Sequence, residues 1–220
     1  MIVKSDEIEK KKNVATKSLK KGNPDQLIQF KIVYWGPGES GKTTNFFRLR
    51  EKFGLTKISN GFSIETTDGR TLWQDSLFLS FDFRFAEQDY RIIIQVVTCT
   101  GQERFLSTRE YVLDGADGIV FVGDSEPEKM EQNKRSFREL ISFADKNRVP
   151  FVIQLNKRDL INAVKMSDFK RQLGLPTDVQ YPDSSLVVYP TNALEGDNIV
   201  PCFEDLMIDV IFSYFRQHYI

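Results

Sequence analysis

The chain has 220 residues, of which 40% are hydrophobic and 28% charged, a balance typical of a soluble globular protein with one or two domains. Its 30 basic and 31 acidic residues give a formal net charge of −1, which argues against a protein that holds nucleic acid by bulk positive charge. No apolar run approaches the length of a membrane-spanning helix. Two cysteines and one histidine are too few for a disulfide scaffold or a zinc site, so we expect a reducing, cytoplasmic setting.

The first 22 residues differ in charge from the rest of the chain. They contain seven lysines and three acidic residues, a local charge of +4, so the remaining residues carry −5. Two interpretations stay open: a solvated flexible tail, and an electrostatic contact with an anionic membrane or partner. Gly22, Asn23 and Pro24 are typical of a hinge. We therefore predict a basic flexible extension over residues 1–27 and one folded domain over residues 28–220.

After this extension the pattern predicts a series of β-strands. Between residues 77 and 85 apolar and polar residues alternate strictly, which indicates a strand with one buried face and one wet face. The run over residues 90–97 is almost continuously β-prone and predicts a central strand, which should form an antiparallel hairpin with the strand before it. The predicted strands cover residues 30–35, 77–85, 90–97, 118–123, 149–155 and 186–189.

Segments with helical periodicity separate these strands. Apolar residues between 130 and 144 share one helix face, and those between 199 and 215 form the apolar stripe of a C-terminal helix that packs on a core. The alternation of strands and helices predicts an α/β fold, with a mostly parallel central sheet, one antiparallel strand and helices on both faces. Ligands in such folds bind at the carboxyl ends of the strands.

The segment Gly36-Pro-Gly-Glu-Ser-Gly-Lys-Thr43 matches the phosphate-binding loop G-x-x-x-x-G-K-[ST], between a predicted strand and a predicted helix. Its glycines let backbone N–H groups surround a phosphate, and the helix N-terminus favours negative charge. Lys42 is expected to contact the β- and γ-phosphates and Thr43 to bind Mg²⁺, while Gly38 leaves space beside the γ-phosphate. The candidate nucleotide-binding residues of this loop are Gly36, Gly38, Glu39, Ser40, Gly41, Lys42, Thr43 and Thr44.

Asn156-Lys-Arg-Asp159 follows a predicted buried strand and favours GTP over ATP. The Asp159 carboxylate can accept two hydrogen bonds from guanine N1–H and N2–H₂, a pair of donors that adenine lacks. The stem of Lys157 can lie on the base plane, and Asn156 is expected to tie this segment to the phosphate loop. Backbone amides at Asn192 and Ala193, after the last strand, are candidate contacts for guanine O6, with a plain loop as the alternative.

Thr98-Cys-Thr-Gly-Gln-Glu-Arg-Phe105 directly follows the predicted central strand and resembles the second switch of Ras-like small GTPases, D-x-x-G-Q-E-R-F. The resemblance covers about residues 30–217 and implies a P-loop NTPase fold, the Ras-like G domain. It also implies that the Gly101 N–H contacts the γ-phosphate and that Gln102 orients the attacking water. Thr98 replaces the usual aspartate, which removes one negative charge from the surroundings of Mg²⁺.

This threonine and several further motifs resemble the MglA-type polarity and gliding-motility GTPases of bacteria and archaea. The matching motifs are Lys31-Ile-Val-Tyr-Trp-Gly-Pro-Gly, Arg70-Thr-Leu with Asp75, Asp117-Gly-Ile-Val-Phe-Val with Asp124-Ser, and Gln154-Leu-Asn-Lys-Arg-Asp-Leu160. The resemblance implies a role in polarity or motility, effector proteins, and a roadblock-type partner that remodels the first switch. It further implies slow hydrolysis that this partner stimulates.

The first switch is expected between residues 55 and 76. Thr66, Thr67 and Thr71 compete for the Mg²⁺-sensing role, and Arg70-Thr71 is the best match to the MglA pattern. Arg70 would then be an arginine finger supplied in cis and would share the catalytic role with Gln102 and Lys42; the alternative is an ordinary surface arginine. Two other functions stay open: a GTP-binding scaffold with negligible hydrolysis, and a metabolic P-loop kinase.

Overall fold

The computed structural model describes residues 26–53, 76–98, 111–175 and 187–219 of the chain. Residues 1–25 of the predicted extension lie outside the described residues, as do most of the two predicted switches. Among the helices of the described ranges, none is both long enough and apolar enough to cross a bilayer.

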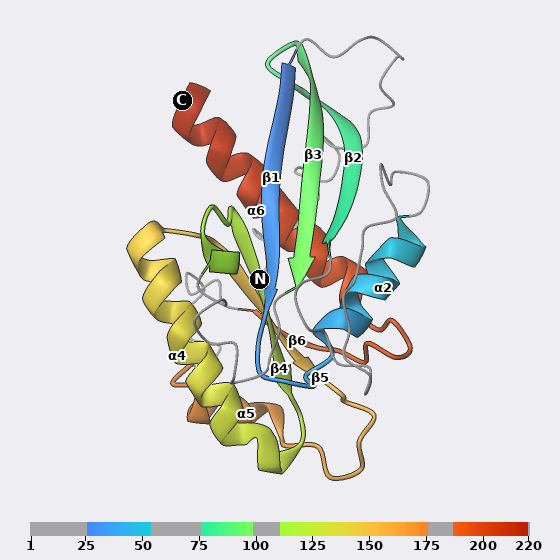
Figure 1. The fold of residues 1–220 in the computed structure, drawn as a ribbon, viewed down its shortest axis with the longest axis vertical. Coiled ribbons are helices and arrows are strands. Elements are labelled where there is room, and N and C mark those ends of the chain that lie inside the picture. Colours follow the sequence, from blue (N-terminus) through green and yellow to red (C-terminus); the bar gives the residue numbers. More distant parts are fainter. Residues whose placement is uncertain (1–25, 54–75, 99–110, 176–186, 220) are drawn as a thin grey trace, which may run out of the picture.

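One six-stranded sheet forms the centre of the molecule, in the order β2-β3-β1-β4-β5-β6 (Figure 1). The pairs β1–β3, β1–β4, β4–β5 and β5–β6 are parallel, whereas β2–β3 is an antiparallel hairpin. This confirms the predicted fold class and the predicted hairpin. The strands are β1 Gln26–Trp35, β2 Ser76–Phe85, β3 Gln88–Thr98, β4 Gly118–Asp124, β5 Phe151–Asn156 and β6 Val188–Pro190.

Strand β1 begins four residues before its predicted start at residue 30, and two before the predicted domain boundary at residue 28. Gln26 and Leu27 pair in parallel register with Tyr90 and Arg91 of β3. Both residues are exposed, so apolar periodicity could not indicate this end of the strand. The hairpin and the first half of β1 consequently extend beyond β4, at the top of Figure 1.

Helices cover both faces of the sheet, as predicted. Helices α2 (Lys42–Lys52) and α6 (Ile199–Tyr219) pack on one face, and α4 (Met130–Asn147) and α5 (Met166–Gln172) pack on the other, with a short 3₁₀ turn η2 (Pro127–Lys129) before α4 (Figure 1). Each face has its own apolar cluster because the strands alternate their side chains between the two faces. On β1, for example, Ile32 belongs to the first cluster and Val33 to the second.

The predicted apolar stripe of α6 lies in the core. Phe215, which is 1% exposed, packs against the rings of Phe83, Phe85 and Tyr90 from the hairpin. The alternating residues of β2 therefore face α6, while Asp82 and Arg84 on the opposite face are exposed. This arrangement leaves the carboxyl ends of β1, β4, β5 and β6 to carry the polar loops described next.

Candidate nucleotide-binding site

The phosphate-binding loop connects the carboxyl end of β1 to the first turn of α2 (Figure 1). The Lys42 amine curls back over the loop and donates to the carbonyl oxygens of Gly36 at 3.2 Å and Pro37 at 2.6 Å. The Lys42 residue is only 6% exposed. These contacts place its charge above the loop, where a phosphate would be surrounded by backbone N–H groups.

Gly41 allows the phosphate loop to touch the segment after β5. Its φ angle is +95°, and a Cβ built there would come within 2.2 Å of the Asn156 Nδ2 atom. That amide nitrogen donates to the Ser40 carbonyl oxygen at 2.8 Å, while the Asn156 Oδ1 atom accepts the Ala193 N–H at 2.9 Å. Asn156 is 2% exposed and thus links three loops from inside the protein. Only glycine combines this backbone conformation with so close an approach.

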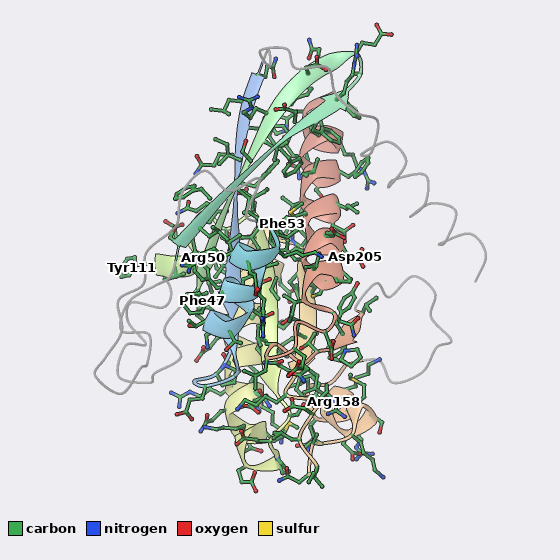
Figure 2. The ribbon with its side chains drawn as sticks, turned by 90° about the vertical axis from the view of Figure 1, so that its right-hand side faces the viewer. Phe47, Arg50, Phe53, Tyr111, Arg158 and Asp205 are labelled. Atoms are coloured by element: carbon green, nitrogen blue, oxygen red, sulfur yellow. The ribbon has the colours of Figure 1, made fainter. Side chains whose placement is uncertain are left out.

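The segment Asn156–Asp159 lies at the carboxyl end of β5. Lys157 has a positive φ of 63°, and its amine forms ion pairs with Asp124 at 2.8 Å and Glu126 at 2.7 Å. Arg158 lies at the end of the molecule that carries α5 (Figure 2). Its guanidinium donates to the Val164 carbonyl oxygen at 2.6 Å and to the Ser125 hydroxyl at 3.2 Å. Asp159 is exposed and is therefore accessible to a ligand.

A third loop, residues 191–195, follows β6 and completes the group. The Thr191 N–H donates to the Leu155 carbonyl oxygen at 2.9 Å, which fixes the start of the loop beside β5. Arg48 of α2 donates to the carbonyl oxygens of Ala193, at 3.2 Å, and of Leu194. The Asn192 side-chain oxygen accepts the Leu194 N–H at 3.1 Å. The loop predicted to approach the guanine base is thus held by hydrogen bonds to β5, to Arg48 of α2 and, within the loop, to the Asn192 side chain.

Several contacts in this region were not predicted from the sequence. Glu39 of the phosphate loop forms an ion pair with Lys129 of η2 at 2.8 Å, although the two residues are far apart in the chain. Asp124 and Glu126 are the partners of Lys157, and Arg48 reaches the third loop from α2. The sequence offered one signal, the Asp124-Ser125 pair among the matching motifs, but periodicity and spacing could not indicate its contacts.

Buried charge at this end of the sheet changes two pKa values. Burial raises the pKa of the fully buried Asp124 carboxyl, although hydrogen bonding and charge attraction from Lys157 lower it in part. Burial also lowers the pKa of Lys157, but the hydrogen bonds and charges of Asp124 and Glu126 outweigh it, so the net shift is upward. Lys157 is therefore held as a cation between two carboxylates.

The residues present fit a nucleotide with a divalent cation. The Ser40 hydroxyl is fully buried in the phosphate loop and has no hydrogen-bond partner among the described residues. Thr43 lies in the first turn of α2, at the end that favours anions. In the described part of the chain no three His, Cys, Asp or Glu side chains are grouped to hold a metal ion.

The structure brings together the predicted residues of the phosphate, base and third loops. Thr98, which replaces the usual aspartate, is the last residue of β3 and is fully buried. Apart from Lys42, the predicted catalytic and switch residues lie outside the described residues, so their roles stay predictions. They are Arg70, Gly101, Gln102 and the three candidate Mg²⁺-sensing threonines, Thr66, Thr67 and Thr71.

Comparison with known proteins gives the family. The model of the ADP-ribosylation factor family matches residues 18–210. Mutual gliding-motility protein MglA of Myxococcus xanthus (strain DK1622) is 39% identical over 152 residues, which cover 67% of this chain and 76% of that protein. ADP-ribosylation factor-like protein 4A of Homo sapiens is 28% identical over 186 residues, 84% of each chain. The chain therefore belongs to the ADP-ribosylation factor family and is a Ras-like small GTPase of the MglA type.

Proposed function

We propose that this protein is a molecular switch that binds GTP with Mg²⁺ and hydrolyses it to GDP and phosphate. The observation that carries the proposal is the position of Asn156, whose amide bonds both the phosphate loop and the Ala193 backbone. A phosphate-binding loop serves many nucleotides, but its direct connection to an Asn-Lys-x-Asp segment favours a guanine nucleotide. The contacts that bind phosphate and base would therefore support one another.

Each predicted residue has a role in this proposal. Lys42 would contact the β- and γ-phosphates, while the hydroxyl groups of Thr43 and Thr71 would hold Mg²⁺, which neutralises charge on the phosphate oxygens. Asp159 would accept hydrogen bonds from guanine, Lys157 would cover the base, and the loop at Asn192 and Ala193 would approach O6. The remaining residues of the phosphate loop, Gly36, Gly38, Glu39, Ser40, Gly41 and Thr44, would surround the phosphates.

Hydrolysis would proceed by in-line attack of water on the γ-phosphorus. Gln102 would orient the water, and the bond from phosphorus to the β–γ bridging oxygen would break, so that GDP leaves with that oxygen. The Gly101 N–H would bind a γ-phosphate oxygen, and Arg70 would stabilise charge on the same group. Since Arg70 and Gln102 both belong to predicted switch segments, we propose slow hydrolysis in the isolated protein and faster hydrolysis when a partner orders them.

The relatives suggest the setting of this switch. The name of the Myxococcus xanthus relative refers to gliding motility, and we propose a related role in motility or polarity for this chain. Its partners would be a roadblock-type activating protein and effectors that recognise the GTP form. The protein would act in the cytoplasm, and the seven lysines of its N-terminal extension would bring it to anionic membrane surfaces.

Single-turnover hydrolysis of bound GTP, measured with the Gln102→Leu variant, tests this chemistry. We expect the variant to retain GTP affinity within about twofold but to lose most of its hydrolysis, because leucine cannot hydrogen-bond the attacking water. Arg70→Ala, in the same assay with an activating partner, should also slow hydrolysis. Glu128→Gln, an exposed substitution between β4 and α4, serves as the control and should leave the rate unchanged.

Two results would contradict this mechanism. If Gln102→Leu hydrolysed GTP at the wild-type rate, Gln102 would have no part in positioning water. If the wild-type protein bound GTP but did not hydrolyse it even with an activating partner, the protein would be a GTP-binding scaffold. The fully buried Thr98 in place of an aspartate is the feature that supports this second function.

A further inference from the structure

The chain segment that follows β4, residues 124–129, connects two loops of the candidate site. At its start, Asp124 and Glu126 form ion pairs with Lys157 of the base loop. At its end, Lys129 forms an ion pair with Glu39 of the phosphate loop at 2.8 Å. This segment, called here the β4 brace, is therefore in contact with the predicted binding surfaces for both the base and the phosphates.

Asp124 of the β4 brace is held by both its backbone and its side chain. Its backbone N–H donates to the Asn133 Oδ1 atom at 2.9 Å, and its carbonyl oxygen accepts the Asn133 Nδ2–H at 2.8 Å. Its side-chain Oδ1 atom accepts the Glu126 N–H at 3.0 Å. Asp124 and Asn133 are both fully buried. The other carboxylate oxygen, Oδ2, is thereby fixed in direction, and it lies 2.8 Å from the Lys157 amine.

Both the backbone and the side-chain amine of Lys157 are fixed in position. Its backbone has a φ of 63°, and its neighbours Asn156 and Arg158 are anchored by their side chains. Its amine is fixed by Asp124, and by Glu126 at 2.7 Å. A lysine side chain ordinarily loses considerable conformational entropy when it packs on a ligand. Because these two carboxylates already order the side chain, its aliphatic stem is preorganised as a surface.

We propose that Asp124 and Glu126 are positioning residues for guanine binding, which act through Lys157 by holding its stem along the plane of the base. This inference rests on the proposed function, because it assumes that Lys157 covers guanine. Buried Asp124 contributes the larger part, since solvent weakens the ion pair of the partly exposed Glu126. Removing either carboxylate should release the stem and speed the dissociation of GDP.

The dissociation rate of a fluorescent GDP analogue from the full-length, GDP-loaded protein tests the proposal. Asp124→Asn keeps the shape of the side chain and removes its charge, and should speed dissociation by about 10- to 100-fold. Glu126→Gln should speed it by about two- to fivefold. Glu128→Gln is the matched control, because Glu128 is an exposed carboxylate of the same segment and the change in charge is identical. It should dissociate GDP at the wild-type rate.

A double-mutant cycle separates positioning from a structural role. In a Lys157→Met background, Asp124→Asn and Glu126→Gln should no longer speed dissociation, because their common partner is absent. The proposal would be overturned if the two substitutions sped GDP dissociation equally in the wild-type and Lys157→Met backgrounds. It would also be overturned if both single variants released GDP at the wild-type rate. If Asp124→Asn does not fold, the Glu126→Gln cycle decides by the same criteria. If the wild-type protein did not bind GDP at all, the proposed function would be overturned together with this inference. If the wild-type protein bound GDP but both single variants released it at the wild-type rate, only this inference would be overturned.

Discussion

Replacing Gly41 with alanine is expected to weaken GDP binding by about 10²- to 10⁴-fold. A Cβ at this position would lie 2.2 Å from the Asn156 Nδ2 atom, so Asn156 must move. Its movement would break the hydrogen bonds to the Ser40 carbonyl oxygen and from the Ala193 N–H, at about 1–3 kcal/mol for each buried group left unsatisfied. The φ of +95° adds about 1–3 kcal/mol of strain. Equilibrium titration with GDP measures the loss.

The matched control for Gly41→Ala is Gly115→Ala. Gly115 also has a positive φ, +66°, but a Cβ there would meet nothing within 4 Å. This control therefore reproduces the backbone strain without the collision, and it should bind GDP within about twofold of the wild-type protein. Urea unfolding of both variants gives their free energies of unfolding. Equal GDP affinity in the two variants would show that Asn156 does not link the loops as the structure indicates.

The second large effect is expected for Asp159→Asn, which should change the preferred base. Asparagine replaces one of the two acceptor oxygens with an NH₂ donor group, so it cannot accept hydrogen bonds from both guanine N1–H and N2–H₂ in the way that the carboxylate does. Each charge-assisted bond contributes about 1.5–3 kcal/mol, and the affinity for GDP should fall by about 10²- to 10⁴-fold. Xanthosine diphosphate carries an acceptor at position 2, which complements asparagine, and its affinity should rise.

Competition between GDP and xanthosine diphosphate measures this change. Asp168→Asn, the same substitution at an ion pair on α5, is the control and should retain the preference for GDP. If Asp159→Asn retained that preference as well, Asp159 would not contact the base. Guanine selection would then depend on the third loop, which Arg48 and Asn156 hold in place.

Local sequence patterns predicted most of the sheet and the loops at its carboxyl edge. The alternation in β2 and the short connection to β3 indicated the hairpin, and the motif at residues 36–43 indicated the turn from β1 into α2. Helix α5 was not predicted because it spans only Met166–Gln172 and buries a single side chain, Phe169. A helix so short shows no amphipathic period.

Contacts between distant residues could not be predicted in this way. Lys157 and Asp124 are separated by an entire helix and strand, and they meet because β4 and β5 are adjacent and parallel. In the sequence, nothing distinguishes Arg48 from an ordinary surface arginine. In the structure, its guanidinium donates hydrogen bonds to the loop after β6. Such pairs depend on the order of strands in the sheet, which no single stretch of sequence determines.

The central claim is that the phosphate and base loops together select a guanine nucleotide. Equilibrium competition between GDP and ADP for the purified full-length protein in the presence of Mg²⁺ tests it most directly. We predict that GDP binds about 10³-fold more tightly or better, because adenine would leave the Asp159 carboxylate without its two donors. Equal affinity, or a preference for ADP, would contradict the claim and would favour a P-loop kinase instead.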